Sequence, residues 1–350
     1  MEALISWQTE CEPIEIEVET FEEGETSKTS SVFIQTEEVS TVEVMTQTEK
    51  KPGMKASDYM FNDEAFHYYT GMNSYEFFRF LLGSFGQVVN ELRYYYQNKP
   101  PLAIEDQFFL TLTKLRLARP HYELSLMFGC SEKEVKNIFV TWINFLHLHF
   151  KEINWWPSRD IVKFYSPVDF RRKYPTTRVV IDGTECPIMK PKQPVGQQAT
   201  YSTYKNRNTV KALIGVTPGG MVSFVSDIYG GSASDRQICE RSNLLQICDP
   251  GDSIMADKGF NMQDLFVPVN VAINIPEFFK KKNRMSASSV LQDRKIASKR
   301  VQVERVIGLA KTFKILKQPM NNTDSELADP IISVCFFLCN FKSAIVPRDA

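Results

Sequence analysis

The chain has 350 residues, of which 43% are hydrophobic and 24% are charged, and its formal net charge is −1. These values are those of a soluble globular protein with one large domain or two ordinary ones. No apolar run is long enough to cross a membrane, and the chain does not open with a basic segment followed by an apolar core. We therefore expect neither a membrane protein nor a secretory signal.

The charge is distributed unevenly along the sequence. The first 50 residues contain thirteen Glu and two Lys and carry −11, which leaves +10 on the other 300 residues. We predict that residues 1–58 form an acidic, disordered leader, because they show neither a helical stripe nor a strand pattern. A solubilising role is favoured over an interaction tail or an electrostatic shield. The basic remainder is compatible with a nucleic-acid partner, although many soluble enzymes carry a similar excess.

Residues 59–150 are expected to form an all-helical subdomain. Apolar residues recur at three- and four-residue steps in Tyr75–Phe85, Gln87–Tyr96 and Asp106–Leu117, which is the period of a helix. The following segment, 151–176, is predicted to be an irregular connector. We expect its aromatic residues Trp155 and Trp156 to pack against the last domain, residues 177–347, rather than to stack on a base.

A helix-turn-helix-like segment lies within the helical subdomain. A short helix over Tyr122–Phe128 precedes a turn at Gly129. Ser131 then caps a second helix, with Glu134 as its capping-box partner. A recognition helix presents basic and amide side chains to DNA, but the start of this one is mixed in charge: Glu132, Lys133, Glu134, Lys136 and Asn137. We therefore favour a helical subdomain packed on the next domain over direct reading of bases.

Three acidic residues of the last domain form the pattern that points to a chemistry. The run Arg178–Ile181 predicts a buried strand, and Asp182 comes directly at its end. The run Ser253–Ala256 repeats this arrangement before Asp257. Glu304 lies instead on a predicted helix, whose apolar residues recur at helical spacing: Ile296, Val303, Ile307 and Ala310.

Carboxylates held at strand ends and on a helix beside the sheet suit hard divalent cations such as Mg²⁺. Two such ions roughly 4 Å apart activate an attacking water or hydroxyl and stabilise the leaving oxygen of a phosphodiester. The alternatives are that each Asp only starts a turn and that Glu304 lies on a solvated helix face. Glu277 is a rival to Glu304, but it follows a strand and lacks a helical setting. The repeated Asp with Gly close behind favours the metal hypothesis.

The other elements of this domain predict the fold class. Two strands with a Pro-Gly-Gly hairpin, a helix and a further strand are expected: Thr209–Thr217, Met221–Tyr229, Ser234–Gln246 and Val269–Ile275. Ser234 is the predicted N-cap of that helix, with Gln237 as its partner. The order of elements is that of an α/β fold with an RNase H-like mixed sheet and flanking helices, preceded by the all-helical subdomain.

Five segments in order carry a specific resemblance: VVIDGTECPI, Tyr204-Lys205-Asn206, GGSASD, IMADKGF and VQVERVIGLAKTFKIL. With them, and from about Phe66 onward, the chain resembles the PIF/Harbinger-type DDE superfamily transposases or endonucleases (DDE transposase family 4-like) and their bacterial insertion-sequence relatives. The resemblance implies that Asp182, Asp257 and Glu304 are the catalytic triad. It also implies that they hold two divalent cations, either Mg²⁺ or Mn²⁺.

Further residues are assigned around this triad. Asp235 matches a recurrent acidic position of the family and is expected, with Glu185, to support the site, and Asp227 is another nearby acid. Cationic residues are expected to contact DNA phosphates, with a solvated charged face as the alternative: Lys280, Lys281, Lys282, Arg284, Arg300, Arg305 and Lys311. The Lys280–Arg284 run also fits a nuclear import signal, which predicts localisation in the nucleus, with the cytoplasm as a second compartment.

The resemblance implies an enzyme, a metal-dependent DNA endonuclease or transposase that hydrolyses phosphodiester bonds and joins transposon ends to target DNA during DNA transposition. The alternative is a domesticated transposase that acts in the nucleus as a DNA-binding or scaffold protein without cleavage. A repair nuclease that does not transpose is a third option. The expected partners are DNA, further copies of the chain in a homo-oligomer, and a separate protein that recognises DNA ends, because the leader shows no DNA-binding module.

Overall fold

The computed structural model describes residues 53–257, 259–276, 287–342 and 346, and of residues 287–293 and 295 only the backbone. Most of the predicted leader, 1–58, therefore lies outside the described residues, as does the basic run Lys280–Arg284. Residues Lys50–Ala350 form one compact unit. In the described part of this unit, every helix is too short or too polar to cross a membrane.

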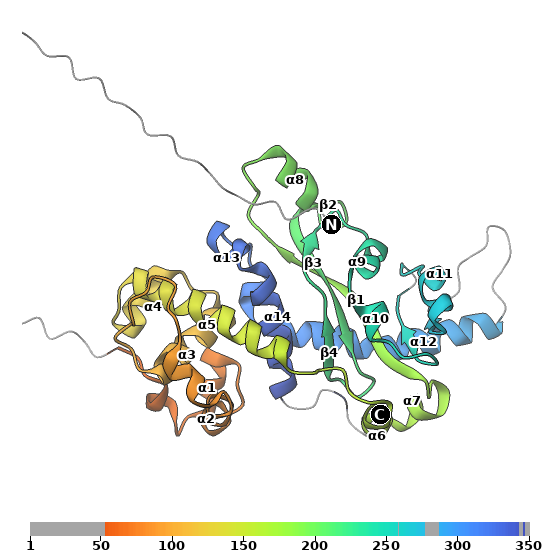
Figure 1. Cartoon of the computed structure of the whole chain (residues 1–350), viewed down its shortest axis with the longest axis horizontal. Helices are drawn as coiled ribbons and strands as arrows, with labels where there is room; N and C mark the ends of the chain where they lie inside the picture. The colour runs from red at the N-terminus through yellow and green to blue at the C-terminus, as the bar shows by residue number, and fades with distance from the viewer. Residues whose placement is uncertain (1–52, 258, 277–286, 343–345, 347–350) are drawn as a thin grey trace, which may run out of the picture. The chain divides into compact units, whose positions relative to one another are not determined.

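An all-helical subdomain precedes the sheet, as predicted (Figure 1). Its helices are α1 (Asp63–Thr70), α2 (Tyr75–Ser84), α3 (Ile104–Leu117), α4 (His121–Phe128) and α5 (Glu132–Glu152). The helix predicted at Gln87–Tyr96 is wrong, because these residues form a 3₁₀ turn, Gly86–Glu91, and a loop. Gly86 follows the end of α2 with φ +68°, a left-handed conformation that Gly adopts without strain.

The helix-turn-helix is present as a local structure. Gly129 ends α4 with φ +66°, and Ser131 and Glu134 form the capping box at the start of α5. The inner face of α5, from Val135 to Phe150, is buried. It packs against α3, α4 and the later helix α14 (Ala328–Leu338). The second helix of the motif is therefore also a core helix that joins the two parts of the unit.

A seven-stranded mixed sheet follows the helical subdomain. Its strands are β1 (Thr177–Pro187), β2 (Tyr201–Ser202), β3 (Arg207–Val216), β4 (Val222–Val225), β5 (Tyr229–Gly230), β6 (Ser253–Met255) and β7 (Ala272–Asn274). β3 is antiparallel to β1 and to β4, whereas β6 is parallel to β1 and to β7. The resulting order β4-β3-β1-β6-β7 is the predicted RNase H-like arrangement, with the short β2 and β5 added along the outer edge of β3.

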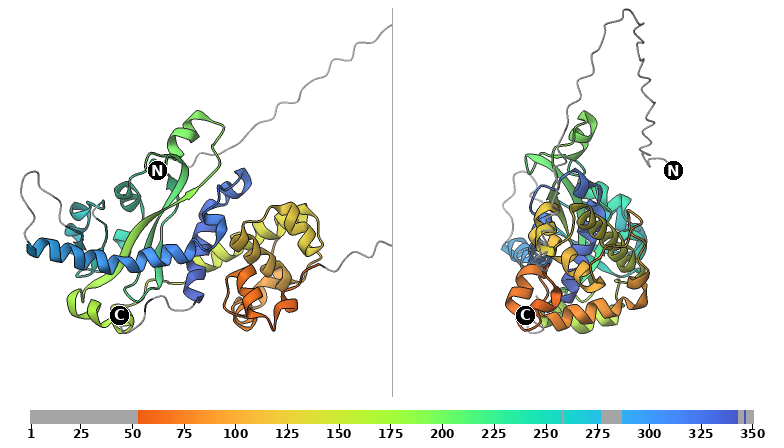
Figure 2. Two further views of the ribbon diagram at one scale, coloured as in Figure 1. Left: turned by 180° about the vertical axis from the view of Figure 1, so that it is seen from behind. Right: turned by 90° about the vertical axis from the view of Figure 1, so that its left-hand side faces the viewer.

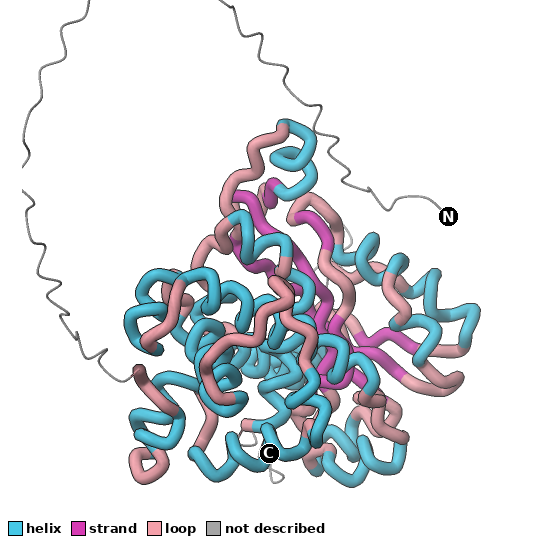
Figure 3. Tube along the Cα trace, turned by 60° about the vertical axis from the view of Figure 1, so that its left-hand side comes forward, coloured by secondary structure: helices cyan, strands magenta, loops and turns pink. Residues whose placement is uncertain are grey.

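Helices cover both faces of this sheet (Figure 2, Figure 3). Successive residues of β1 point to opposite faces. Val180 belongs to a hydrophobic cluster with α14 and α12 (Ala287–Ala310), and Ile181 belongs to a second cluster with α9 (Asp235–Arg241) and α10 (Leu244–Ile247). The predicted helix Ser234–Gln246 is thus divided into α9 and α10, but its capping box of Ser234 and Gln237 is present. The remaining helices are α8 (Pro194–Thr200), α11 (Gln263–Phe266) and α13 (Asn322–Glu326).

The connector is more regular than predicted, because it contains α6 (Arg159–Tyr165) and α7 (Val168–Lys173). The predicted packing of its aromatic residues is confirmed. Trp155 stacks on Phe337 with the ring centroids 5.0 Å apart. The guanidinium of Arg178 lies 5.4 Å from the centroid of Trp156. These contacts fix the entry of the chain into β1.

A buried ion pair links the helical subdomain to the domain that contains the sheet. Lys114 Nζ on α3 lies 3.2 Å from a carboxylate oxygen of Asp324 on α13, and the two side chains are only 3% and 9% exposed. Arg116 Nη1 donates to the carbonyl oxygen of Thr312 over 2.9 Å. The helical subdomain is therefore attached to this domain by specific polar contacts of α3 as well as by the shared core.

Candidate active site

Asp182 and Asp257 lie at the same level of two neighbouring strands. The last residues in register between the parallel strands β1 and β6 are Val180 and Met255, and each Asp comes two residues later. Neighbouring strands are about 4.8 Å apart, so the two side chains start from adjacent points. Asp182 lies within β1 and not at its end as predicted, because β1 continues to pair with β3 as far as Pro187.

Glu304 reaches the same place from α12. Val303 and Ile307 of this helix are buried in the cluster that contains Val180. Asp182 shares that face of the sheet, because residues two apart on a strand point to the same side. The side chain of Glu304 is 54% exposed, so the third acid borders solvent while the first is half-buried.

The three carboxyl groups influence one another electrostatically. Burial raises the pKa of Asp182 from its ordinary value of 3.8 to about 6, and the charges of Asp257 and Glu304 add to this effect. The charge of Arg300 and a hydrogen bond from the backbone N–H of Gly183, 2.9 Å long, act in the opposite direction. Among the described residues, Arg300 thus offsets only part of the negative charge of this site.

Arg300 lies between two of these acids. Its Nη1 donates to Asp257 Oδ1 over 2.7 Å, and its Nη2 lies 3.7 Å from Glu304 Oε1. The side chain is only 10% exposed, and its Nε has no hydrogen-bond partner among the described residues. Arg300 and Glu304 are four residues apart and therefore share one face of α12. This helix thus brings both the third acid and its counter-charge to the site.

The chemistry of this site fits a divalent cation. Carboxylate oxygens are the ligands that Mg²⁺ and Mn²⁺ prefer, and a positive group already lies against two of the acids. In the present conformation, no three His, Cys, Asp or Glu side chains of the described residues are arranged to hold one ion. Asp182, Asp257 and Glu304 would hold the ion once the guanidinium of Arg300 has moved from between them.

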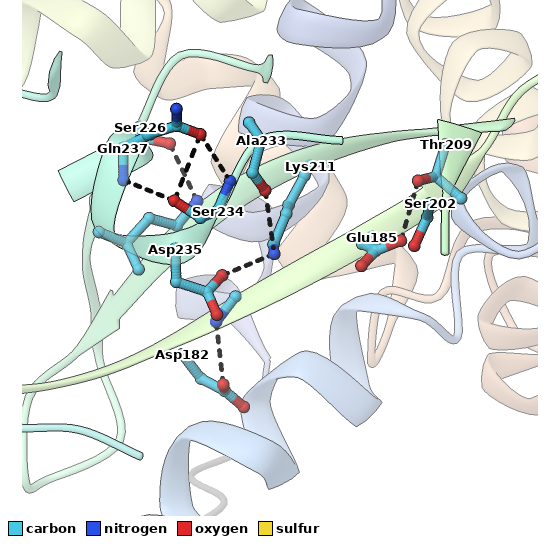
Figure 4. A network of polar contacts seen from close by, with 12 residues as sticks. Asp182, Glu185, Ser202, Thr209, Lys211, Ser226, Ala233, Ser234, Asp235 and Gln237 are labelled. Carbon is cyan, nitrogen blue, oxygen red and sulfur yellow. Dashed lines mark hydrogen bonds and ion pairs between the residues drawn. The ribbon is translucent and has the colours of Figure 1, made fainter. Parts of the chain in front are cut away.

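Asp235 and Glu185, which were predicted to support the site, lie across β1 from Asp182 (Figure 4). Lys211 Nζ is 2.7 Å from Asp235 Oδ1. Thr209 Oγ1 donates to Glu185 Oε2 over 2.9 Å. Both acids are thus partnered on the face opposite the triad, and neither points toward it.

The backbone at Gly183 lies between Asp182 on one face of β1 and the pair of Asp235 and Lys211 on the other face. A Cβ atom at this position would lie 2.7 Å from Asp235 Oδ1 and 3.3 Å from Lys211 Cε. The pair of Asp235 and Lys211 therefore packs directly against the backbone beside Asp182. Asp235 was recognised from the sequence, but Lys211 was missed, because its position opposite Glu185 depends on the pairing of β1 with β3.

The other predicted residues are dispersed. Lys280–Arg284 and Glu277 lie outside the described residues. Arg305 is exposed on α12, and Lys311 is half-buried just after the end of this helix. Asp227 is exposed, and its carboxylate lies 3.9 Å from Lys151 Nζ of α5. Arg300 was predicted as a contact for DNA phosphates, and its pairing with the acids was missed, although its spacing from the third acid was a usable signal.

Side chains at the start of α5 contact a loop of the same subdomain. Asn137 Oδ1 accepts a hydrogen bond from the backbone N–H of Tyr96 over 2.9 Å, and its Nδ2 donates to the carbonyl oxygen of Asn98 over 2.9 Å. Lys133 Nζ and Lys136 Nζ lie 5.4 Å and 5.8 Å from the centroid of the Tyr96 ring. The amide and both cations of this surface therefore already have partners, which favours the predicted packing role.

Comparison with known families agrees with both parts of the structure. Residues 100–152, which contain α3, α4 and α5, match the family described as the helix-turn-helix of DDE superfamily endonuclease. Residues 181–340, which contain all three acids, match the family described as DDE superfamily endonuclease. No curated protein matches the chain. The PIF/Harbinger subtype stays a prediction. Two parts of the chain thus match a DDE superfamily endonuclease domain and, before it, the helix-turn-helix of that superfamily, a combination that implies DNA as the partner.

Proposed function

We propose that the chain cleaves DNA as a divalent-metal-dependent endonuclease of the transposase type. The observation that carries this proposal is the convergence of Asp182, Asp257 and Glu304 on one end of the parallel strands, within a domain that matches DDE superfamily endonucleases. We assign these three residues as catalytic residues and metal ligands. When bound, two Mg²⁺ or Mn²⁺ ions would supply an activated attacking oxygen and stabilise the leaving oxygen.

The residues around the triad orient its carboxylates and offset part of their negative charge. Asp182 is held by the N–H of Gly183, whose backbone is in turn supported by Asp235 and Lys211. Arg300 offsets part of the negative charge. Once released from the acids, its guanidinium remains within the same site, and its planar fork of donors matches a phosphate oxygen pair. We assign Arg300 to binding the DNA phosphate beside the bond that is cleaved.

The finer parts of this proposal rest on the sequence resemblance. They are the joining of transposon ends to target DNA, the PIF/Harbinger subtype, assembly of several copies, and a separate protein that recognises the ends. Localisation in the nucleus rests on the run Lys280–Arg284. The partner protein is supported further by the helix-turn-helix, because the amide and cations at the start of α5 are engaged within the chain.

Cleavage of labelled duplex DNA in Mg²⁺ or Mn²⁺ tests the proposal. Asp182→Asn, Asp257→Asn and Glu304→Gln are each expected to lower the rate by about 100-fold or more, because the metal contributes several kcal/mol to transition-state stabilisation. Asp227→Asn, a change at an exposed acid that belongs to another ion pair, serves as the matched control and should cleave like the wild type. Equal activity in all four variants would refute the assignment.

A DNA-binding protein without cleavage is the second candidate. The observation that favours it is the ion pair of Arg300 with Asp257, which gives the acids a partner without any metal. The two candidates differ in one measurement. If the wild type binds DNA and Mn²⁺ but leaves every duplex intact, including duplexes that carry transposon ends and reactions that contain the end-recognising protein, the second candidate is correct.

A further inference from the structure

A large groove lies beyond the far end of β1 and is not part of the triad. Its volume is about 950 Å³, which is at the upper end of the roughly 300–1,000 Å³ that is usual for ligand pockets. It is formed by Pro187–Lys190 after β1, by α8, by β2 and the turn that follows it, and by Pro319. Figure 1 shows α8 beside β2 beyond the end of the sheet.

The walls of this groove are held in place by a set of specific contacts. Asn208 Nδ2 donates to the carbonyl oxygen of Gln197 over 3.0 Å and to Thr200 Oγ1 over 2.8 Å, which ties α8 to β3. Met189 N donates to the carbonyl oxygen of Met320 over 2.9 Å. A Cβ atom at Gly230 would lie only 2.1 Å from the carbonyl oxygen of Ala199. The groove is therefore a built feature of the fold.

The groove is lined by one exposed aromatic ring and by positive charge, and a second exposed ring lies next to a lining residue. Tyr201 lines it and is 43% exposed, and Tyr204, beside the lining residue Thr203, is 80% exposed. Lys205 Nζ lies 4.3 Å from the centroid of the Tyr204 ring. The lining includes Lys190 and Arg207 but no Asp or Glu.

The described residues leave this positive charge without an ionic partner. Among the hydrogen bonds and ion pairs of the described residues, none uses the charged end of Lys190 or of Arg207. The lining also contains Gln198 and Asn206, whose amide groups can pair with the edge of a base. Most of the lining surface is nevertheless apolar. A partner of this groove should therefore have flat apolar faces, polar edges and negative charge.

Unpaired nucleotides have this combination of properties. Bases stack on aromatic side chains, and Lys and Arg contact the phosphates between them. A closed duplex exposes phosphates but buries the faces of its bases, so it leaves the apolar floor unused. A peptide partner would use the apolar floor, but the excess of positive charge without any lining acid favours a polyanion.

The position of the groove connects it to the triad. Pro187 is five residues beyond Asp182 on β1, which corresponds to about 16 Å at 3.3 Å per residue. This length equals the rise of about five base pairs of DNA. We propose that the groove binds unpaired nucleotides of a DNA strand whose cleavage site lies at the triad. This inference rests on the proposed function for its choice of DNA, but the binding itself does not require cleavage.

Equilibrium binding of short oligonucleotides tests the proposal. The probes are a single strand that carries 2-aminopurine, whose fluorescence reports stacking, and a duplex of the same sequence. Tyr201→Ala/Tyr204→Ala is expected to lower the affinity for the single strand by about tenfold or more and the affinity for the duplex by less than twofold. Tyr201→Phe/Tyr204→Phe, which keeps both rings, should restore binding and shows that loss of affinity is not loss of fold.

Matched variants separate the groove from the rest of the protein surface. Tyr68→Ala removes an equally exposed ring from α1 and should leave both affinities unchanged. Lys190→Gln/Arg207→Gln should weaken single-strand binding and reduce its dependence on salt. Unchanged single-strand affinity in the tyrosine and cation variants, or an equal loss for single strand and duplex, would overturn the proposal and leave the groove to a peptide.

Failure of this inference can be told apart from failure of the proposed function. Asp182→Asn should abolish cleavage but retain single-strand binding that depends on the tyrosines. A wild type that shows this binding but never cleaves DNA, even with the end-recognising protein present, supports the groove and refutes the nuclease. A wild type that cleaves DNA but binds single strands independently of Tyr201 and Tyr204 refutes the groove alone.

Discussion

Arg300 and Asp257 are joined by a hydrogen bond of 2.7 Å between a guanidinium nitrogen and a carboxylate oxygen. Arg300 belongs to α12, which also carries Glu304. Asp257 follows β6, and β6 pairs with β1, the strand that carries Asp182. This one contact therefore fixes the helix of the third acid against the sheet that carries the other two. It also places a positive charge where a metal ion would compete for the same oxygens.

The first prediction concerns this competition. Arg300→Gln is expected to bind Mn²⁺ about fivefold more tightly than the wild type in the absence of DNA, because removing a nearby positive charge changes the electrostatic energy by on the order of 1 kcal/mol. Titration calorimetry measures the affinity directly. Arg305→Gln changes an exposed cation of the same helix and should have a much smaller effect, because solvent screens it. Weaker binding in Arg300→Gln would contradict the prediction.

The second prediction concerns the stability of the fold. Because the pKa of Asp182 is raised from 3.8 to about 6 in the folded state, the folded protein holds this proton more tightly than the unfolded chain does. The resulting stabilisation is complete below pH 3.8 and is lost as the pH rises through 6. The neutral variant Asp182→Asn avoids the loss, so it should be more stable than the wild type at pH 7.5 by on the order of 2 kcal/mol.

Urea denaturation in the presence of a metal chelator measures this difference. The advantage of Asp182→Asn should shrink as the pH is lowered toward 4, where the wild-type carboxyl is also protonated. Asp227→Asn, a change at an exposed acid, should show no such dependence. Equal stability of Asp182→Asn and the wild type at pH 7.5 would show that burial does not penalise this carboxylate. A gain in stability together with a loss of cleavage is the usual compromise at an active site.

Local signals in the sequence predicted the boundaries of several elements correctly. The capping boxes of Ser131 with Glu134 and of Ser234 with Gln237 are both present, because such a motif is decided by residues within one helical turn. The extent of β1 was missed for the opposite reason. The strand continues past Asp182 because it pairs with β3, which lies about thirty residues later in the chain. The residues of β1 alone do not predict that pairing.

The same distinction applies to the candidate site. The three acids were predicted as the site because two follow predicted strands and one lies on a predicted helix. The contact of Arg300 with Asp257 joins residues 43 positions apart, and the pair of Lys211 with Asp235 joins two elements through their packing. The i,i+4 spacing of Arg300 and Glu304 was a local signal, but the contacts with Asp257 and between Lys211 and Asp235 had none, because side-chain partners across elements are set by tertiary structure.

The third prediction concerns the buried pair of Lys114 and Asp324. Removing one partner leaves the other charge buried and unpaired, so Lys114→Met or Asp324→Leu alone should destabilise the protein by about 3–5 kcal/mol. Burial lowers the pKa of Lys114, and the charge of Asp324 opposes this change. The free energy of unfolding, measured with urea, tests the prediction.

The double variant Lys114→Met/Asp324→Leu is the control for this experiment. Replacing both charges by apolar groups of similar volume is often neutral or stabilising, so the double variant should recover most of the loss. If it also restores DNA binding, the pair serves only to hold α3 against α13. Single variants that unfold like the wild type would show that the pair is not buried in solution.

The fourth prediction compares two glycines near the triad. Gly183→Ala places a methyl group 2.7 Å from Asp235 Oδ1, so either the ion pair with Lys211 or the backbone beside Asp182 must shift. Such overpacking costs typically about 1–3 kcal/mol, and cleavage should fall because the shift displaces a carboxylate that we propose to be catalytic. Gly308→Ala, on α12, meets no atom within 4 Å and should instead stabilise the protein by about 0.5–1 kcal/mol through the higher helix propensity of Ala.

Unfolding by heat or urea and the cleavage rate are measured on both variants. The comparison distinguishes the effect of where the methyl group is added from the effect of adding a methyl group at all. Both variants add the same methyl group to the same domain, so opposite effects on stability assign the loss in Gly183→Ala to its contact with Asp235. Adding Asp235→Ala to Gly183→Ala removes the atom that the new methyl group meets, and part of the stability should return. If Gly183→Ala keeps full activity and stability, the face of β1 opposite the triad does not position Asp182.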